Sequence, residues 1–181
     1  MVSKEENLLE LFFNSPTREW HFEELVQEAG IARSKADRWL KLFVRQKLVR
    51  RIKEKGRMPH YIADHDSPNY RNRKKLFALN RLYETGLLNH LMSLKKAKMV
   101  IMFGSFARWD WYKNSDVDVF IYGSSEGLSV AKYEMKLHRD IQLFVCQDRK
   151  ALARFGAGLV ENILKGNIIK GEDFVGEVLN A

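Results

Sequence analysis

Two pairs of residues, each placed beside an apolar run, could perform chemistry in this chain of 181 residues. Gly104 and Ser105 directly follow one apolar run, and Asp116 and Asp118 enter another about ten residues later. A glycine–serine turn can present backbone N–H groups to a phosphate, and paired carboxylates can hold the Mg²⁺ that accompanies it. This layout predicts a site for a nucleoside triphosphate and its metal ions.

The two apolar runs are expected to be strands that carry this site. Residues 99–103 are continuously apolar, which is typical of a strand buried on both faces. Asp116 and Asp118 enter the run 117–122, and residues i and i+2 of a strand point to one face, about 6–7 Å apart at Cα. Two Mg²⁺ ions about 3.5–4 Å apart could then activate an attacking hydroxyl and stabilise a departing pyrophosphate.

The segment after the first strand is expected to bind the phosphates. Its glycine lets the backbone approach a ligand closely, and the serine and the amides after it open a short helix whose N–H groups favour phosphate. Two nearby cations, Arg108 and Lys113, can add charge-assisted contacts. A turn followed by a solvated acidic strand end is the simpler alternative. The predicted nucleotide-binding residues are Gly104, Ser105, Arg108, Lys113 and Ser115.

The combined pattern resembles the signature of the DNA polymerase β-like nucleotidyltransferase superfamily, in particular the minimal nucleotidyltransferases. The resemblance rests on the segments 104–108 and 115–119 and covers about residues 75–165. It implies an α/β (α+β) domain, with a mixed sheet flanked by helices, that transfers a nucleoside monophosphate from an NTP with Mg²⁺ or Mn²⁺ as cofactor. The acceptor could be a protein side chain, RNA or a small molecule. In minimal nucleotidyltransferases paired with a helical toxin the acceptor is the toxin, so an antitoxin role stays open.

One departure from the family pattern lies just after the phosphate-binding segment. Trp109 stands where these proteins commonly have glycine, and Trp111 and Tyr112 follow it closely. These aromatic side chains could stack on a base or form a dimer contact.

The second departure concerns a third carboxylate, which these enzymes usually carry on a later strand. The equivalent strand is expected over residues 137–146, where Gln142 takes that position. An amide cannot act as a general base and binds metal more weakly than a carboxylate. Asp140 lies two residues earlier, on the same face of a strand, and is our candidate third catalytic acid beside Asp116 and Asp118. Without such an acid, the alternative is a catalytically weak or inactive fold that serves as a DNA-binding regulator, nucleotide sensor or dimerisation unit.

Basic residues are concentrated in the first half of the chain. The net charge is +8, and between Arg33 and Arg57 eleven basic residues are opposed only by Asp37 and Glu54. Such a local excess is a footprint for a polyanion. The alternative is a solvated face on a basic protein.

The order of elements before residue 66 resembles that of a winged helix-turn-helix. The expected elements are helices over 3–13, 22–29 and 34–46, followed by strands over 48–53 and 60–63. In such modules the third helix enters the major groove and the hairpin touches the backbone or the minor groove, although many serve only in protein interaction. The predicted DNA-binding residues are Arg33, Lys35, Arg38, Lys41, Lys53, Lys55 and Arg57.

Three segments are therefore expected: a winged helix-turn-helix domain over 1–66, a linking helical segment over 67–96 and a nucleotidyltransferase-like domain over 97–181. A helical pattern over 70–94, broken or kinked at Gly86, could join the domains or pair with a second copy in a homodimer.

The remaining composition indicates the setting in which the protein works. No apolar run approaches the ~20 residues that span a bilayer, and the first residues lack the apolar core of a signal peptide. Cys146 is the one cysteine, so no internal disulfide can form. We expect a buried structural thiol there rather than a nucleophile, and a reducing, cytoplasmic setting.

Overall fold

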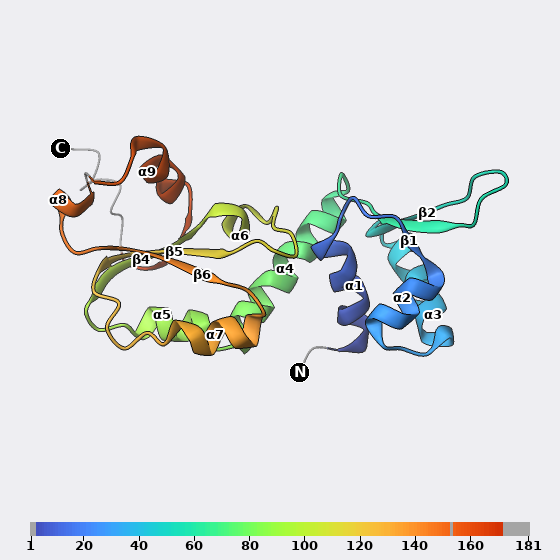
Figure 1. Ribbon diagram of the computed structural model, residues 1–181, viewed down its shortest axis with the longest axis horizontal. Coiled ribbons are helices and arrows are strands. Elements are labelled where there is room, and N and C mark those ends of the chain that lie inside the picture. The colour runs from blue at the N-terminus through green and yellow to red at the C-terminus, as the bar shows by residue number, and fades with distance from the viewer. Residues whose placement is uncertain (1–2, 153, 172–181) are drawn as a thin grey trace. The chain divides into compact units, whose positions relative to one another are not determined.

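The computed structural model describes residues 3–152 and 154–171, apart from the side chain of residue 149. The chain forms two compact units, Met1–Phe77 and Ala78–Ala181 (Figure 1). The segment expected to link two domains is thus shared between the units. Helix α4 (Pro68–Glu84) crosses the boundary, and Gly86, in the left-handed region, separates it from α5 (Leu87–Ser93).

The first unit contains three helices and a three-stranded antiparallel sheet of order β1-β3-β2. Ser3 caps the first helix together with Glu6, and Gly30 ends the second in the left-handed conformation that glycine adopts without strain. Leucine and phenylalanine side chains of the three helices form a fully buried core. The elements are α1 (Lys4–Asn14), β1 (Trp20–His21), α2 (Phe22–Ala29), α3 (Arg33–Arg45), β2 (Val49–Ile52) and β3 (His60–Ala63).

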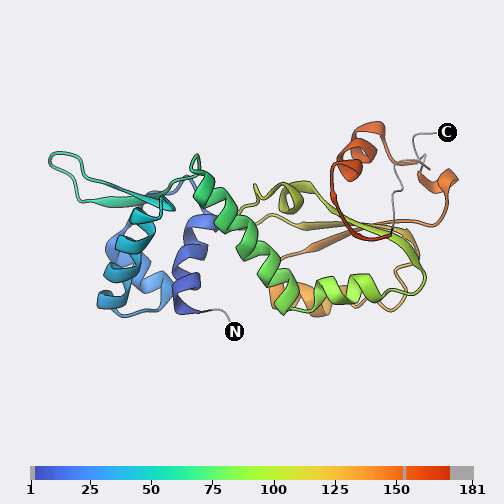
Figure 2. The ribbon, with the colours of Figure 1, turned by 180° about the vertical axis from the view of Figure 1, so that it is seen from behind.

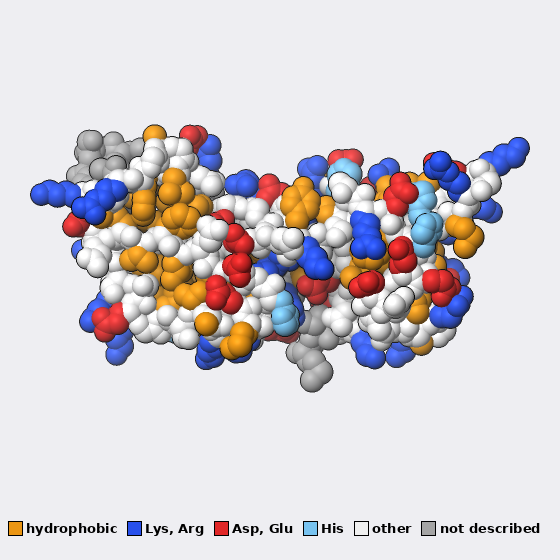
Figure 3. All heavy atoms as spheres, in the orientation of Figure 1, with side chains coloured by type: hydrophobic (Ala, Val, Ile, Leu, Met, Phe, Trp, Pro, Cys, Tyr) orange, Lys and Arg blue, Asp and Glu red, His pale blue; other side chains and the backbone are white. Residues whose placement is uncertain are grey.

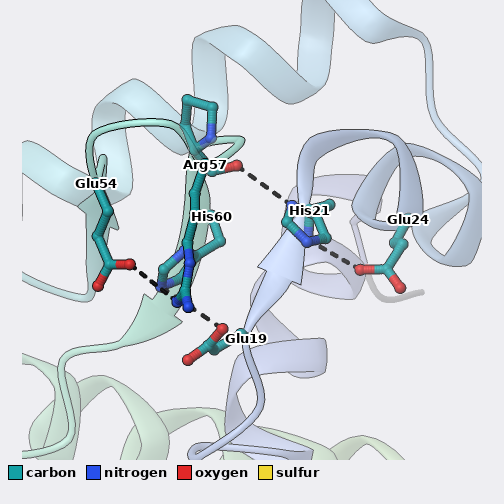
Figure 4. A network of polar contacts seen from close by, with 7 residues as sticks. Glu19, His21, Glu24, Glu54, Arg57 and His60 are labelled. Atoms are coloured by element: carbon teal, nitrogen blue, oxygen red, sulfur yellow. Dashed lines mark hydrogen bonds and ion pairs between the residues drawn. The ribbon is translucent and has the colours of Figure 1, made fainter.

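Two histidines tie the base of the β2–β3 hairpin to the rest of this unit (Figure 4). His60 is buried, and its Nε2 atom lies 3.9 Å from a carboxylate oxygen of Glu19. The ring of His21 lies with Nδ1 3.4 Å from the carbonyl oxygen of Pro59. The hairpin therefore leaves the sheet from a fixed base.

The second unit is built on a mixed sheet of order β6-β5-β4-β7, in which β5 and β6 are parallel and the other pairs are antiparallel. Helices α5 and α7 cover one face, and α6, α8 and α9 lie on the other (Figures 1 and 2). The predicted α/β architecture with a mixed sheet flanked by helices is confirmed. The elements are β4 (Ala97–Phe103), α6 (Gly104–Arg108), β5 (Val117–Gly123), α7 (Val130–Leu137), β6 (Ile141–Cys146), α8 (Arg149–Leu152), α9 (Ala157–Leu164) and β7 (Asn167–Lys170).

The core between the sheet and α8–α9 includes Phe103, Phe120 and Cys146. Cys146 is fully buried, as expected for a structural thiol, and its S–H group donates to the carbonyl oxygen of Asp148 at 2.9 Å. Burial raises the pKa of this thiol, which keeps it protonated. Within the described residues, no helix is both long and apolar enough to cross a membrane.

Candidate nucleotide-binding site

The centre of the site is a close approach between Gly104 and Asp118. Antiparallel pairing sets Phe103 opposite Asp118, so the carboxylate lies against the first residue of α6. A Cβ atom at position 104 would lie only 1.9 Å from Oδ2 of Asp118, and Gly104 also has φ = +71°. Only glycine can occupy this position without displacing the carboxylate.

Asp116 completes a carboxylate pair, and Gln142 holds it from the neighbouring strand. The parallel register aligns Asp118 with Gln142, and the side-chain N–H of Gln142 donates to Oδ2 of Asp116 at 2.5 Å. Gln142 therefore occupies the place beside the pair where a third carboxylate was sought.

Asp140 lies outside β6, because the strand begins at Ile141 rather than at residue 137. Helix α7 extends to Leu137, which is buried together with Tyr133 one turn earlier, so residue 137 belongs to this helix and not to the strand. Asp140 accepts a backbone hydrogen bond from Val117 and, together with Asp116, lines a pocket of about 450 Å³. No group of three or more His, Cys, Asp or Glu side chains placed to hold a metal ion exists among the described residues.

Ionisation of Asp118 is made costly by its surroundings. The pKa of Asp118 lies above its ordinary value, chiefly because burial disfavours the charged form and also because Asp116 is negative, while Arg108 acts in the opposite direction. A divalent cation would relieve this repulsion, and carboxylate oxygens are the ligands that Mg²⁺ prefers. The pair therefore fits one Mg²⁺ whose other ligands are water and substrate phosphates. On the face seen in Figure 3, acidic side chains gather beside exposed hydrophobic ones in the second unit.

The other predicted nucleotide-binding residues lie on α6 and in the loop before Asp116. Arg108 donates to Asp110 and to Asn162, each at 3.2 Å, so its guanidinium is held at the end of α6. Ser115 accepts a hydrogen bond from the backbone of Tyr112 at 2.8 Å and closes the turn before Asp116. Lys113 lines the pocket beside Asp116, and Ser105 stands in the first turn of α6.

Arg139 is a positioning residue of this site that the sequence did not reveal. Its Nη1 atom donates to the carbonyl oxygens of Tyr112, Lys113 and Ser115 at 2.6, 2.7 and 3.1 Å. Its guanidinium also stacks on Trp111, 4.7 Å from the ring centre. One side chain from the end of α7 therefore fixes the loop that leads into Asp116. A lone arginine carries no sequence signal for such a role.

The aromatic residues after α6 have structural explanations. Trp111 is 1% exposed and stacks on Phe106, with the ring centres 5.3 Å apart. The expectation of a base or dimer contact is therefore wrong for it. Trp109 has φ = +64°, in the left-handed region that glycine adopts more readily. This conformation explains why the family pattern commonly has glycine there. Tyr112 is largely exposed, so a contact with a base or with a second copy stays a prediction for it.

The predicted DNA-binding residues all lie in the first unit. Four of them stand on α3, and the other three lie in the loop that joins β2 to β3. The first group comprises Arg33, Lys35, Arg38 and Lys41, and the second Lys53, Lys55 and Arg57.

Comparison with known proteins supports the assignment of the second unit. The family model described as "Polymerase beta, Nucleotidyltransferase" matches residues 86–174. The match supports a domain of the DNA polymerase β-like superfamily. It spans the described elements from β4 to β7, so the nucleotidyltransferase-type domain contains Gly104, both aspartates and Gln142. Searches of the curated proteins and of the solved structures gave no match to this chain.

Replacing Gly104 by alanine tests the close approach directly. The new Cβ would collide with the Asp118 carboxylate, and the alanine would have to adopt a left-handed φ. We expect Gly104→Ala to lower the free energy of unfolding by about 1–3 kcal/mol and to weaken nucleotide binding, measured by denaturant titration and calorimetry. Gly127→Ala is the control, because Gly127 also has a positive φ but has no atom near the new Cβ. Equal losses of nucleotide affinity in both variants would contradict the proposed contact.

The raised pKa of Asp118 makes the stability of the metal-free protein depend on pH. A carboxyl group whose pKa is higher in the folded protein than in the unfolded chain stabilises the fold only at low pH, and this contribution disappears as pH rises through the folded value. We therefore expect Asp118→Asn to melt above the wild type at about pH 7 in EDTA, with a gap that closes toward about pH 4. Thermal unfolding followed by circular dichroism measures this gap. The exposed Asp66→Asn is the charge-matched control, and a gap of the same size there would contradict the assignment.

Loss of the Arg139 guanidinium should loosen the loop before Asp116. Arg139→Met removes the donors to three carbonyl groups, and we expect it to lower the free energy of unfolding by about 2 kcal/mol. Arg139→Lys should restore only part of this, because an ammonium lacks the planar fork that stacks on Trp111. Urea unfolding measures both, with the exposed Arg154→Met as control. Full recovery in the lysine variant would show that charge alone matters.

Proposed function

We propose that the protein is a Mg²⁺-dependent nucleotidyltransferase that moves a nucleoside monophosphate from an NTP to an acceptor, and that its first unit is a DNA-binding winged helix-turn-helix. The observation that carries the first part is the Asp118 carboxylate against Gly104, with Asp116 beside it. A carboxylate pair at the start of a helix that follows a buried strand can hold both a metal ion and a triphosphate.

In this proposal the chain's residues bind and orient the nucleotide. The backbone of Gly104 and Ser105 would receive the β- and γ-phosphates, because no side chain at position 104 obstructs their approach. Asp116 and Asp118 would hold Mg²⁺ or Mn²⁺, which supplies charge neutralisation for the triphosphate and the leaving pyrophosphate. Lys113 would add positive charge at the edge of the site, and Arg108, whose charge Asp110 partly cancels, would add less.

The proton of the attacking hydroxyl needs a base, and Asp140 and Gln142 are the two side chains to compare. Asp140 shares the 450 Å³ pocket with Asp116 and could accept this proton from an acceptor bound there. Gln142 is closer to the pair but its amide cannot accept a proton at neutral pH. The proposed activity therefore depends on Asp140.

A second candidate function is favoured by the Gln142–Asp116 hydrogen bond. The amide of Gln142 uses a lone pair of Asp116 that could otherwise bind metal. A site built in this way suits a nucleotide-binding regulator that retains the substrate without transferring it. In either case the acceptor or partner could be a protein, such as a helical toxin, and a second copy of the chain could pair with the first.

DNA binding is proposed from the order of elements in the first unit. Helices α1 to α3 precede a hairpin with basic residues in its loop, which is the arrangement of winged helix-turn-helix modules. The excess of positive charge between residues 33 and 57 supports a polyanionic ligand.

Label transfer from NTPs separates the two candidates. The full chain is incubated with each α-phosphate-labelled NTP, Mg²⁺, and protein, RNA or small hydroxylated acceptors. We expect transfer by the wild type, a loss of about 10³-fold or more in Asp116→Asn/Asp118→Asn, and a similar loss in Asp140→Asn. Calorimetry on the same samples measures Mg²⁺-dependent NTP binding.

The outcomes of this experiment are distinct. Binding without transfer to any acceptor would favour the regulator, whereas the absence of both would contradict both candidates. Asp66→Asn/Asp148→Asn is the charge-matched control, because neither of its residues lies in the site.

A further inference from the structure

The arginines of the first unit fall into two classes when their partners are considered. Arg33 forms an ion pair with Glu23 at 2.6 Å. Arg57 forms one with Glu54 at 3.0 Å, which Figure 4 shows. A carboxylate beside a guanidinium cancels much of its charge and occupies N–H donors that a phosphate would need. These two arginines, although prominent in the sequence, are therefore poor electrostatic contacts for DNA.

The second class consists of arginines with no partner among the described residues. Arg38, Arg45 and Arg51 are exposed, and their side chains form no ion pair or hydrogen bond in the part of the chain that the structure describes. Arg38 and Arg45 are seven residues apart on α3, two helical turns, and so share one face. Arg51 stands on β2 directly opposite Tyr61 of β3.

These arginines meet in one cleft between α3 and the hairpin strands. The cleft encloses about 900 Å³ and is lined by the three arginines, Lys41, Tyr61 and a few neighbours. Its one acidic side chain, Asp37, is held by Lys41 at 2.7 Å. Three unpaired positive charges therefore face a single concavity.

We propose that this cleft is the main contact of the protein with the phosphate backbone of duplex DNA. Guanidinium groups match phosphate oxygens with two parallel hydrogen bonds. The Tyr61 hydroxyl can donate a further hydrogen bond to phosphate, and Val44, 37% exposed, offers an apolar contact to sugar. This inference rests on the proposed DNA binding and adds Arg45, Arg51 and Tyr61 to the DNA-binding residues predicted from the sequence.

Two double variants with the same change in net charge test the proposal. The full chain is titrated into a fluorescently labelled, mixed-sequence duplex of about 30 base pairs, and anisotropy is followed over a salt series. We expect R45A/R51A to lose at least about 10-fold in affinity near 0.1 M salt, and the slope of log Kobs against log salt to become less steep by about two. R33A/R57A leaves the cleft intact, and the Glu23 and Glu54 carboxylates that it frees are solvent-exposed and screened by salt, so the loss of affinity should stay below about 3-fold. R45K/R51K should retain most of the binding, because backbone phosphates accept either cation, and thermal unfolding checks each fold.

The results can overturn the cleft separately from DNA binding itself. If wild-type protein binds duplex DNA and R33A/R57A weakens it as much as R45A/R51A does, the cleft is not the main contact. If R45A/R51A weakens binding to a labelled single strand but leaves binding to the duplex unchanged, single-stranded DNA and not duplex DNA is the ligand of the cleft. If the wild type binds no duplex at any salt concentration, the proposed DNA binding fails, and the cleft inference fails with it.

Discussion

The arrangement of the second unit depends on one close contact, that between the Asp118 carboxylate and the backbone of Gly104. The contact requires a residue without a side chain at the junction of β4 and α6, and it requires β5 to pair with β4 so that Asp118 lies opposite Phe103. The sheet therefore places a carboxylate where a triphosphate would approach. Its cost is visible in the raised pKa of Asp118, since burial and Asp116 both disfavour the charged form. A cation bound here would offset this repulsion and favour the charged form of Asp118.

The loop before the carboxylates is fixed by contacts from distant parts of the domain. Arg139 holds three carbonyl groups of this loop, and the stacked pair of Phe106 and Trp111 forms its base. Gln142 then holds Asp116 directly. Restraint on both sides of Asp116 suits a site in which ligand geometry matters. The same hydrogen bond to Gln142 also distinguishes this site from one with three carboxylates. It is the reason why a regulator is considered beside the enzyme.

Local sequence rules could predict the parts of the site that depend on neighbouring residues. The alternation of a strand predicts Asp116 and Asp118 on one face, although β5 begins only at Val117 and Asp116 precedes it. A glycine after a buried strand predicts a close backbone approach. Contacts between residues far apart in sequence could not be predicted in this way. Arg139 lies more than twenty residues from the loop it holds, and the start of β6 depended on how far α7 extends over the sheet. Likewise, the excess of positive charge was visible in the sequence, but the ion pairs that cancel part of it were not.

A crystal structure of the protein with a non-hydrolysable NTP and Mg²⁺ tests the central claim most directly. We predict a metal ion coordinated by carboxylate oxygens of Asp116 and Asp118, with the β- and γ-phosphates against the backbone of Gly104 and Ser105. The position of Asp140 relative to that metal would also distinguish the enzyme from the regulator. A nucleotide bound elsewhere, or one bound with no metal at the two aspartates, would contradict the claim.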